Sequence, residues 1–108
     1  MAMIEQLTNE TFDTTISTSA VYVVKFYTKW CPDCVRTDQG YKELSLSLAE
    51  KARFGQVDAD AQPDLAQRFG IRGIPTLLVF RDGMETDRLH SRDAKTKQQL
   101  EAFLTQAL

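Results

Sequence analysis

Hydrophobic positions along the chain alternate between strand-like and helix-like spacing. The stretch from Val21 to Tyr27 is β-branched, aromatic and almost continuously apolar, which is typical of a buried central strand. Elsewhere, apolar residues recur three or four positions apart, which is the spacing of one buried helix face. In chain order, the expected elements are a strand from Ile4 to Leu7, a helix capped by Thr8 with Phe12 and Ile16 buried, the strand from Val21 to Tyr27, a helix burying Tyr41, Leu44 and Leu48, a strand from Phe54 to Val57, a helix from Pro63 to Phe69, a strand from Thr76 to Phe80, a strand near Glu85 to His90, and a helix from Thr96 to Leu108.

Local signals decide two of these segments. Leu44 to Leu48 alternates like a strand, but it belongs to a long run without a turn signal, so a helix is expected there. Asp82-Gly83 is a hairpin signal between the last two strands. The resulting β-α-β-α-β-α-β-β-α order predicts an α/β fold in one domain, residues 1–108, with a mixed sheet of about five strands flanked by about four helices.

Composition narrows the range of partners and compartments. Apolar residues make up 43% of the chain and charged residues 26%, and a net charge of −2 argues against nucleic acid or an anionic membrane as main partner. No apolar stretch approaches membrane-spanning length. Met1 to Gln6 has neither the basic start nor the apolar core of a secretory signal. Two cysteines are few for a disulfide-stabilised secreted fold, so we expect a cytoplasmic protein.

The two cysteines, Cys31 and Cys34, directly follow the expected central strand and are separated by Pro32 and Asp33. Two thiols on one turn can close into a disulfide with little rearrangement. Cys31, at the start of a helix, gains thiolate character from the unpaired backbone N–H groups and the helix dipole. The thiolate is the form that attacks a disulfide, and the second thiol resolves the mixed disulfide.

The same cysteines admit two other interpretations. A zinc site takes four ligands, often Cys or His, and the chain adds only His90 to the pair, so carboxylates would have to complete the set. His90 is itself expected at an exposed strand position. An inert buried pair of thiols is the other alternative. The two-residue spacing favours redox chemistry over both, and we expect no bound metal.

Three segments and the order of elements resemble the thioredoxin family. The segments are Val24 to Cys31, Val57 to Asp60, and Phe69 to Thr76. A Cys-x-x-Cys motif beside a βαβ pattern is the general signature of thioredoxin-like redox proteins. The resemblance covers nearly the whole chain, and it implies a thioredoxin fold and a thiol–disulfide oxidoreductase that reduces protein disulfides.

The resemblance also implies a role for individual residues. Cys31 is then the exposed nucleophile and Cys34 the buried resolving thiol. Pro75 is then a cis-proline packed against the cysteines, whereas from the sequence alone an ordinary trans proline is expected. A groove that adds a substrate's extended backbone like a strand is assigned to Trp30, Gly73 and Ile74. Trp30 is alternatively a plain core residue.

Near the cysteines the chain departs from the family pattern. Pro32-Asp33 stands where Gly-Pro is usual, as in thioredoxin-related proteins with narrower substrate sets. The other replacements are Lys25 for the buried aspartate that relays a proton to the resolving cysteine, Gln56 for the lysine that accompanies it, Gln39 for a helix proline, and Ser91 for a late groove glycine. We expect these changes to affect redox potential, thiol acidity and the set of partners rather than the fold.

Two of the replacements introduce charge. Asp33 either is a solvated residue that favours the helix start, or opposes the Cys31 thiolate with Lys29 offsetting part of its charge.

Lys25 either extends its ammonium to water at the strand end or lies buried beneath Cys34. In the buried case we expect Asp58, on the neighbouring strand, to pair with it. Lys25 would then act as a fixed positive charge that favours thiolates.

The expected reaction needs no bound cofactor, because the cysteine pair carries the electrons. The resemblance implies an external reductase, a flavin enzyme drawing on NADPH, that restores the dithiol, and a protein that works as a monomer. The rival hypothesis is a binding or accessory module with the same fold, whose thiols do not turn over.

Overall fold

The computed structural model describes residues 4–108, and its elements follow the expected order. They are β1 (Ile4–Gln6), α1 (Phe12–Ile16), β2 (Val21–Tyr27), α2 (Pro32–Ser47), β3 (Arg53–Asp58), α3 (Pro63–Arg68), β4 (Thr76–Arg81), β5 (Met84–Leu89), a 3-10 turn (Ser91–Asp93) and α4 (Lys97–Ala107). The ambiguous segment before residue 48 is helical, as predicted. Residues 1–3, which belong to the N-terminal stretch considered above, lie outside the described residues.

The five strands form one mixed sheet in the order β1-β3-β2-β4-β5. β2 runs parallel to β3 and antiparallel to β4, and Phe26 pairs with Thr76. The end of β2 and the start of β4 therefore meet at the same edge of the sheet. This register brings the cysteines that follow β2 next to the loop that precedes β4.

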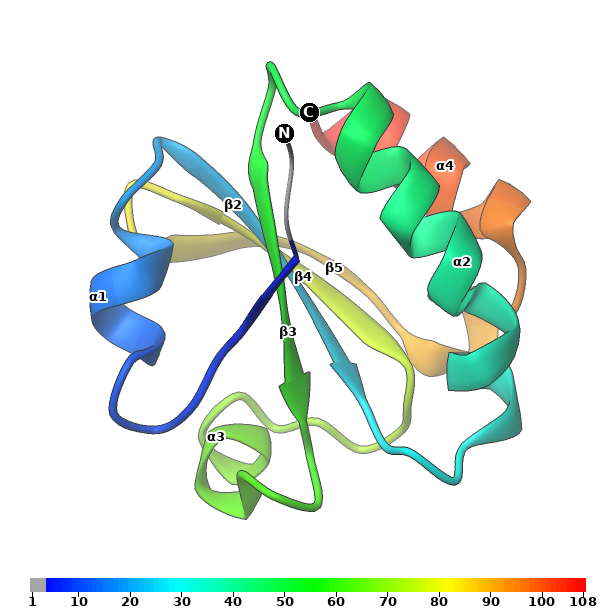
Figure 1. Cartoon of the computed structure of the whole chain (residues 1–108), viewed down its shortest axis with the longest axis horizontal. Coiled ribbons are helices and arrows are strands. Elements are labelled where there is room, and N and C mark those ends of the chain that lie inside the picture. Colours follow the sequence, from blue (N-terminus) through cyan, green and yellow to red (C-terminus); the bar gives the residue numbers. More distant parts are fainter. Residues whose placement is uncertain (1–3) are drawn as a thin grey trace.

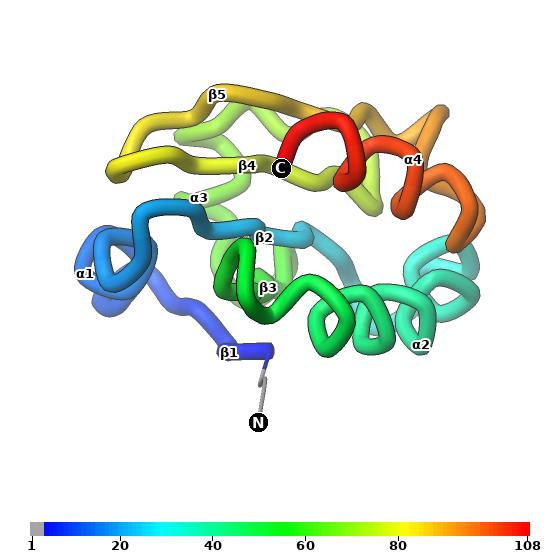
Figure 2. The backbone as a smooth tube through the Cα atoms, turned by 90° about the horizontal axis from the view of Figure 1, so that it is seen from above, coloured from blue at the N-terminus to red at the C-terminus, as the bar shows by residue number. Residues whose placement is uncertain are grey.

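Helices cover both faces of the sheet, and each face has its own hydrophobic core (Figure 1). Tyr22, Val24 and Phe26 of β2 pack with α1 and α3, whereas Val23 packs with α2 and α4. Residues 22–26 are all buried, which explains why the strand is almost continuously apolar. Seen along the sheet, α1 and α2 lie at opposite ends of the molecule (Figure 2).

The helices α2 and α4 approach each other closely at Gly40. A Cβ atom on Gly40 would lie 2.8 Å from both Cβ and Cγ of Lys97. A capping box begins α4: the Thr96 side chain accepts from the Gln99 N–H, and the Gln99 side chain accepts from the Thr96 N–H. The loop between residues 91 and 96 is thus held against the first half of α2.

Two local expectations need correction. Thr11, not Thr8, is the N-cap of α1. Thr8 forms the preceding turn instead, since its carbonyl oxygen accepts from the N–H groups of Thr11 and Phe12. The 3-10 turn after β5 was not predicted, because it has no apolar periodicity. Within residues 4–108, no helix combines the length and the apolar character needed to cross a bilayer.

Candidate active site

Both cysteines lie in the first turn of α2. Cys31 is the N-cap residue, with extended backbone, and Pro32 follows at the first helical position, where its missing N–H leaves no helix bond unmade. The Cys34 N–H donates to Cys31 Sγ over 3.2 Å. This sulfur therefore takes the place of the usual capping oxygen, and hydrogen bonding at the positive end of a helix stabilises a thiolate.

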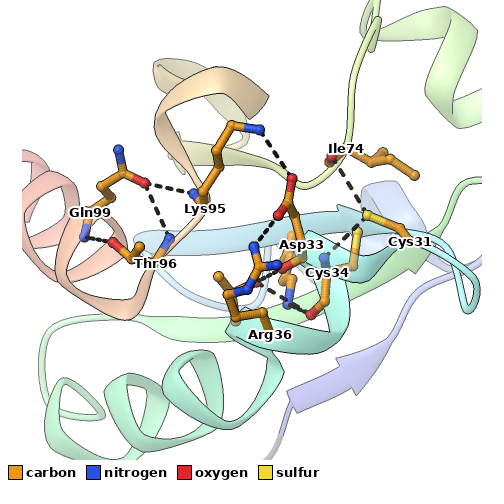
Figure 3. Close-up of polar contacts among 10 residues, drawn as sticks. Cys31, Asp33, Cys34, Arg36, Ile74, Lys95, Thr96 and Gln99 are labelled. Carbon is orange, nitrogen blue, oxygen red and sulfur yellow. Dashed lines mark hydrogen bonds and ion pairs between the residues drawn. The ribbon is translucent and has the colours of Figure 1, made fainter.

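The loop before β4 brings a backbone carbonyl to the same sulfur. The Ile74–Pro75 peptide bond is cis, as the resemblance predicts. Figure 3 shows Cys31 Sγ pointing to the Ile74 carbonyl oxygen, 3.7 Å away. The main chain that precedes the cis-proline therefore lies directly beside this thiol.

The expected contrast between an exposed Cys31 and a buried Cys34 is wrong. Cys31 is 5% exposed and Cys34 is 3% exposed, because Cys31 Sγ turns inward between the helix start and the Ile74 carbonyl. Trp30 is not a core residue, since it is 69% exposed and presents an aromatic surface beside the thiols. The two cysteines differ in their surroundings rather than in their exposure.

Cys34 holds its proton tightly. Burial, first of all, and the contact with Cys31 raise the pKa of the Cys34 thiol to about 12, while a Thr28 backbone hydrogen bond and the charge of Lys25 lower it. Only a thiolate attacks a disulfide. Deprotonation of Cys34 is therefore the demanding step in closing a bond between the two cysteines.

Lys25 lies beneath the resolving cysteine. It is 1% exposed, its Nζ donates to the Cys34 carbonyl oxygen at 3.2 Å, and the same nitrogen lies 5.5 Å from the centre of the Tyr41 ring. Burial lowers the pKa of Lys25, and the charge of Asp38, above all, opposes that shift. The expected burial beneath Cys34 is confirmed, whereas an ammonium in water is wrong because helices cover both faces of β2. The expected ion pair with Asp58 is also wrong, because Asp58 turns into its own loop.

Asp58 organises the loop after β3. Its Oδ1 accepts from the backbone N–H groups of Asp60 (3.0 Å) and Ala61 (3.3 Å). The turn aims Asp60 Oδ2 at Trp30, whose indole Nε1–H donates to it at 2.6 Å. No sequence pattern singles out Asp60, although it ends one of the segments that resemble the family. Its role depends on the shape of the loop, which no local pattern reports.

A cavity of about 230 Å³ opens behind Cys34, and its largely apolar lining includes the polar side chains of Lys25, Thr28 and Asp38. Thr28 is buried, and its hydroxyl has no hydrogen-bond partner in the part of the chain that the structure describes. The space can hold several water molecules at about 30 Å³ each. A proton that leaves Cys34 can therefore move past polar groups of the cavity toward Asp38, which is partly exposed.

Gln56 lies next to Lys25 in the sheet register but turns away from the cysteines. Its Nε2 donates to Gln6 Oε1 at 2.9 Å, and Gln6 Nε2 donates to the Tyr27 hydroxyl at 3.0 Å. This chain of contacts ties together β1, β2 and β3. No contact of Gln56 with either cysteine supports the expected influence on the resolving step.

Asp33 neither stays free in solvent nor depends on Lys29. Its carboxylate forms ion pairs with Lys95, at 3.1 Å, and with Arg36 (Figure 3). The hydrogen bond from Lys95, first of all, lowers the pKa of Asp33. Gln99 Oε1 accepts from the Lys95 N–H at 2.7 Å, so the cation that offsets Asp33 is held by the capping box of α4.

Gly73 and Ser91 meet beside the cis-proline. A Cβ atom on Gly73 would overlap Ser91 Oγ and lie 3.0 Å from Ser91 Cβ. The Gly73 carbonyl oxygen accepts from the Thr76 hydroxyl at 2.6 Å. A side chain at residue 73 would therefore require Ser91 to rotate and shift.

The geometry suits dithiol chemistry. Cys31 and Cys34 are free thiols joined by a backbone hydrogen bond, so closing the disulfide needs only a local movement. Among residues 4–108, no three His, Cys, Asp or Glu side chains are grouped to hold a metal ion.

Comparisons with known proteins agree with this geometry. "Bloodstream-specific protein 2" of Trypanosoma brucei brucei is 35% identical over 99 residues, which are 92% of this chain and 20% of that protein. "Thioredoxin-2, mitochondrial" of Schizosaccharomyces pombe is 40% identical over 85 residues, which are 79% of this chain and 63% of that protein. The chain thus spans less than two thirds of the length of these relatives.

Among solved structures, Plasmodium falciparum thioredoxin superposes with a TM-score of 0.88 at 25% identity, covering 97% of this chain and all of that one. The family model described as Thioredoxin matches residues 3–106. Since that match runs from β1 into α4 and includes both cysteines and the cis-proline loop, the chain belongs to the thioredoxin family.

Proposed function

We propose that the chain is a thiol–disulfide oxidoreductase that reduces disulfides in proteins. One observation carries this proposal: Cys31 Sγ caps the helix that holds Cys34 and lies 3.7 Å from the Ile74 carbonyl oxygen. A backbone docked at Ile74 therefore brings its disulfide to the sulfur that the helix start stabilises as a thiolate. Family membership supports the same activity.

The reaction has two exchange steps. The Cys31 thiolate attacks one sulfur of the substrate disulfide, forms a mixed disulfide and releases the other substrate sulfur as a thiolate, which takes up a proton. Cys34 then loses its proton and attacks Cys31 Sγ, which releases the second substrate sulfur. The substrate gains two electrons and two protons, and the Cys31–Cys34 disulfide forms.

Lys25 supports the second step. Its charge favours the Cys34 thiolate, which burial opposes. The cavity that Lys25, Thr28 and Asp38 line gives the released proton a route toward Asp38 and solvent. In this chain a cation occupies the position where the family pattern has a carboxylate, so Lys25 stabilises the thiolate electrostatically as long as it keeps its proton.

The partners and compartment follow from the proposed activity. A disulfide-oxidised protein needs a reductant, and we propose an external flavin reductase that draws on NADPH. We also propose that the protein is a monomer and that it resides in the cytoplasm. The compartment is inferred from the two cysteines of the chain, which suit a reducing compartment better than an oxidising one. Comparison of its redox state in cytoplasmic and organelle fractions tests the compartment.

Insulin reduction with dithiothreitol tests the activity. Catalysed precipitation of the insulin B chain is expected for the wild type and is abolished by Cys31→Ser. Cys34→Ser is expected to accumulate a mixed disulfide with its substrate, detectable as a mass increase that dithiothreitol removes. Folded wild type without turnover would contradict the proposal and favour a binding module, as would activity that survives Cys31→Ser.

A further inference from the structure

A basic wall borders the path to the reactive cysteine. A cavity of about 390 Å³ opens beside the cis-proline loop, and its walls include Arg72, Arg88, His90 and Ser91. A second cavity, of about 270 Å³, adjoins it through His90 and Ser91 and adds Arg92. No aspartate or glutamate is among the described residues that line either cavity.

The first cavity lies where a docked substrate must pass. β4 and β5 are antiparallel, with Leu77 paired to Leu89, so the residues before β4 lie beside those after β5. The contact between Gly73 and Ser91 shows this directly. Gly73 also precedes Ile74, whose carbonyl lies at the thiol. A backbone extended along Ile74 therefore places residues flanking its cysteine over this cavity.

The cations of the wall retain capacity to bind an anion. Arg72 is exposed and has no carboxylate within 4.0 Å in the described chain. Arg88 uses Nε and Nη2 on Glu85, at 2.8 and 2.9 Å, and Nη2 also donates to the Phe69 carbonyl oxygen. The Nη1 group of Arg88 remains, with two further N–H donors.

The acidic groups closest to the thiols do not cancel this charge. Asp33 is paired with Lys95 and Arg36. Asp60 keeps its charge while it accepts from the neutral indole of Trp30, but it lines neither cavity. The unpaired charge on the approach to Cys31 is therefore positive on the side of the cis-proline loop. Complementary charge at such a rim mainly raises the rate of productive encounter.

We propose that the cavity beside Gly73 is a subsite for an acidic side chain that flanks the reactive cysteine of a polypeptide substrate. Arg72 provides the long-range attraction, Arg88 offers the remaining donors, and Ser91 supplies a hydroxyl. The proposal rests on the proposed function and adds the substrate class: disulfides in acidic segments.

Three matched disulfide peptides test the subsite. All three have the same length and carry one cysteine that forms the disulfide bond. The three residues on either side of this cysteine are all Glu in one peptide, all Gln in the second and all Lys in the third. The measured quantity is the second-order rate constant for reduction by the reduced protein, at low ionic strength. Each value is divided by the rate with tris(3-hydroxypropyl)phosphine, a reductant that attacks disulfides as a neutral molecule, which removes the intrinsic reactivity of the peptide.

The wild type is expected to favour the Glu peptide over the Lys peptide by about fivefold, since one exposed ion pair changes a rate by up to about that factor and Arg88 is already paired with Glu85. Added salt at about 0.5 M should remove most of this preference. Arg72→Ala is expected to reduce the preference about threefold. Arg72→Lys keeps the charge and should retain most of it, and so should Lys51→Ala, which removes an exposed lysine on the turn before β3.

The possible results separate this proposal from the proposed function. Failure to reduce any of the three peptides would overturn the oxidoreductase itself. Equal normalised rates for all three peptides in the wild type would overturn the acidic subsite and leave the oxidoreductase intact. A preference for Glu that Arg72→Ala and Lys51→Ala reduce equally would assign the effect to net charge and would also overturn the subsite.

Discussion

Replacing Lys25 by Met tests whether the buried ammonium helps Cys34 lose its proton. Met is apolar and of similar length, so it fills the space beside Tyr41 and removes only the charge and the N–H donors. Because the charge of Lys25 lowers the pKa of Cys34, the substitution is expected to raise that pKa above its value of about 12. Below that pKa Cys34 is protonated in both proteins, so the substitution is expected to slow attack by Cys34 rather than to change the stability of the disulfide.

The geometry gives the size of the effect. Lys25 Nζ is 3.2 Å from the Cys34 carbonyl oxygen, so its charge lies beside the residue that carries the thiol. Two unit charges about 4 Å apart interact by about 4 kcal/mol at an effective dielectric constant near 20 and by about 1 kcal/mol in water, and we take roughly 1 kcal/mol because a cavity opens at this site. At about 1.36 kcal/mol per pKa unit, Cys34 should react about fivefold more slowly.

Alkylation by iodoacetamide measures this difference when Cys34 is the sole cysteine, in a Cys31→Ser background. From about pH 7 upward, the rate rises about tenfold per pH unit while Cys34 is mostly protonated, and the Lys25→Met variant stays about fivefold slower. Burial places the pKa of Lys25 below its ordinary 10.5. The two rate profiles should therefore converge as the pH rises through that pKa, because the parent then loses the same charge.

Lys29→Met is the matched control, since Lys29 is exposed and lines the same cavity. Its alkylation profile should stay within about twofold of the parent. In urea unfolding, the free energy of unfolding of Lys25→Met should exceed that of the parent by about 1 kcal/mol or more, because burying an ammonium is costly. Coincident rate profiles for Lys25→Met and its parent, in a variant that folds normally, would refute the electrostatic argument.

Two further substitutions test the surroundings of the thiols. Lys95→Met removes the main partner of Asp33, so the pKa of the Asp33 carboxyl should rise toward its ordinary value, as a carboxyl ¹³C titration would show; an unchanged titration would mean that Arg36 alone suffices. Asp60→Ala removes the acceptor for the indole N–H of Trp30, which is the only tryptophan. The fluorescence anisotropy of that indole should fall, and an unchanged value would show that packing alone holds the ring.

Much of the fold follows from the sequence, because strands and helices have different periods and the chain keeps each period clearly. The buried strand that contains Lys25 was recognisable despite that residue, since its neighbours on both sides are apolar. The N-cap of α1 was misplaced by three residues, from Thr11 to Thr8, because both are threonines and either could begin a turn.

At the site, the cysteine pair and the cis-proline could be predicted because their chemistry resides in motifs of adjacent residues. The partners of charged side chains could not. Asp33 and Lys95 lie 62 positions apart, and a lysine can reach several acceptors, so only the packing of α4 against α2 selects that pair. The same reasoning applies to Lys25, which contacts a backbone carbonyl that no sequence pattern marks.

The sequence by itself determined the order of elements, the central strand and the two thiols that carry the chemistry. Those properties depend on short-range periodicity and on residue type. Tertiary structure decided that Cys31 is buried, that Asp58 turns away from Lys25, and that Arg72 and Arg88 border the same cavity as Ser91. Such features depend on where long side chains end in space, and that is set by contacts between segments far apart in the chain.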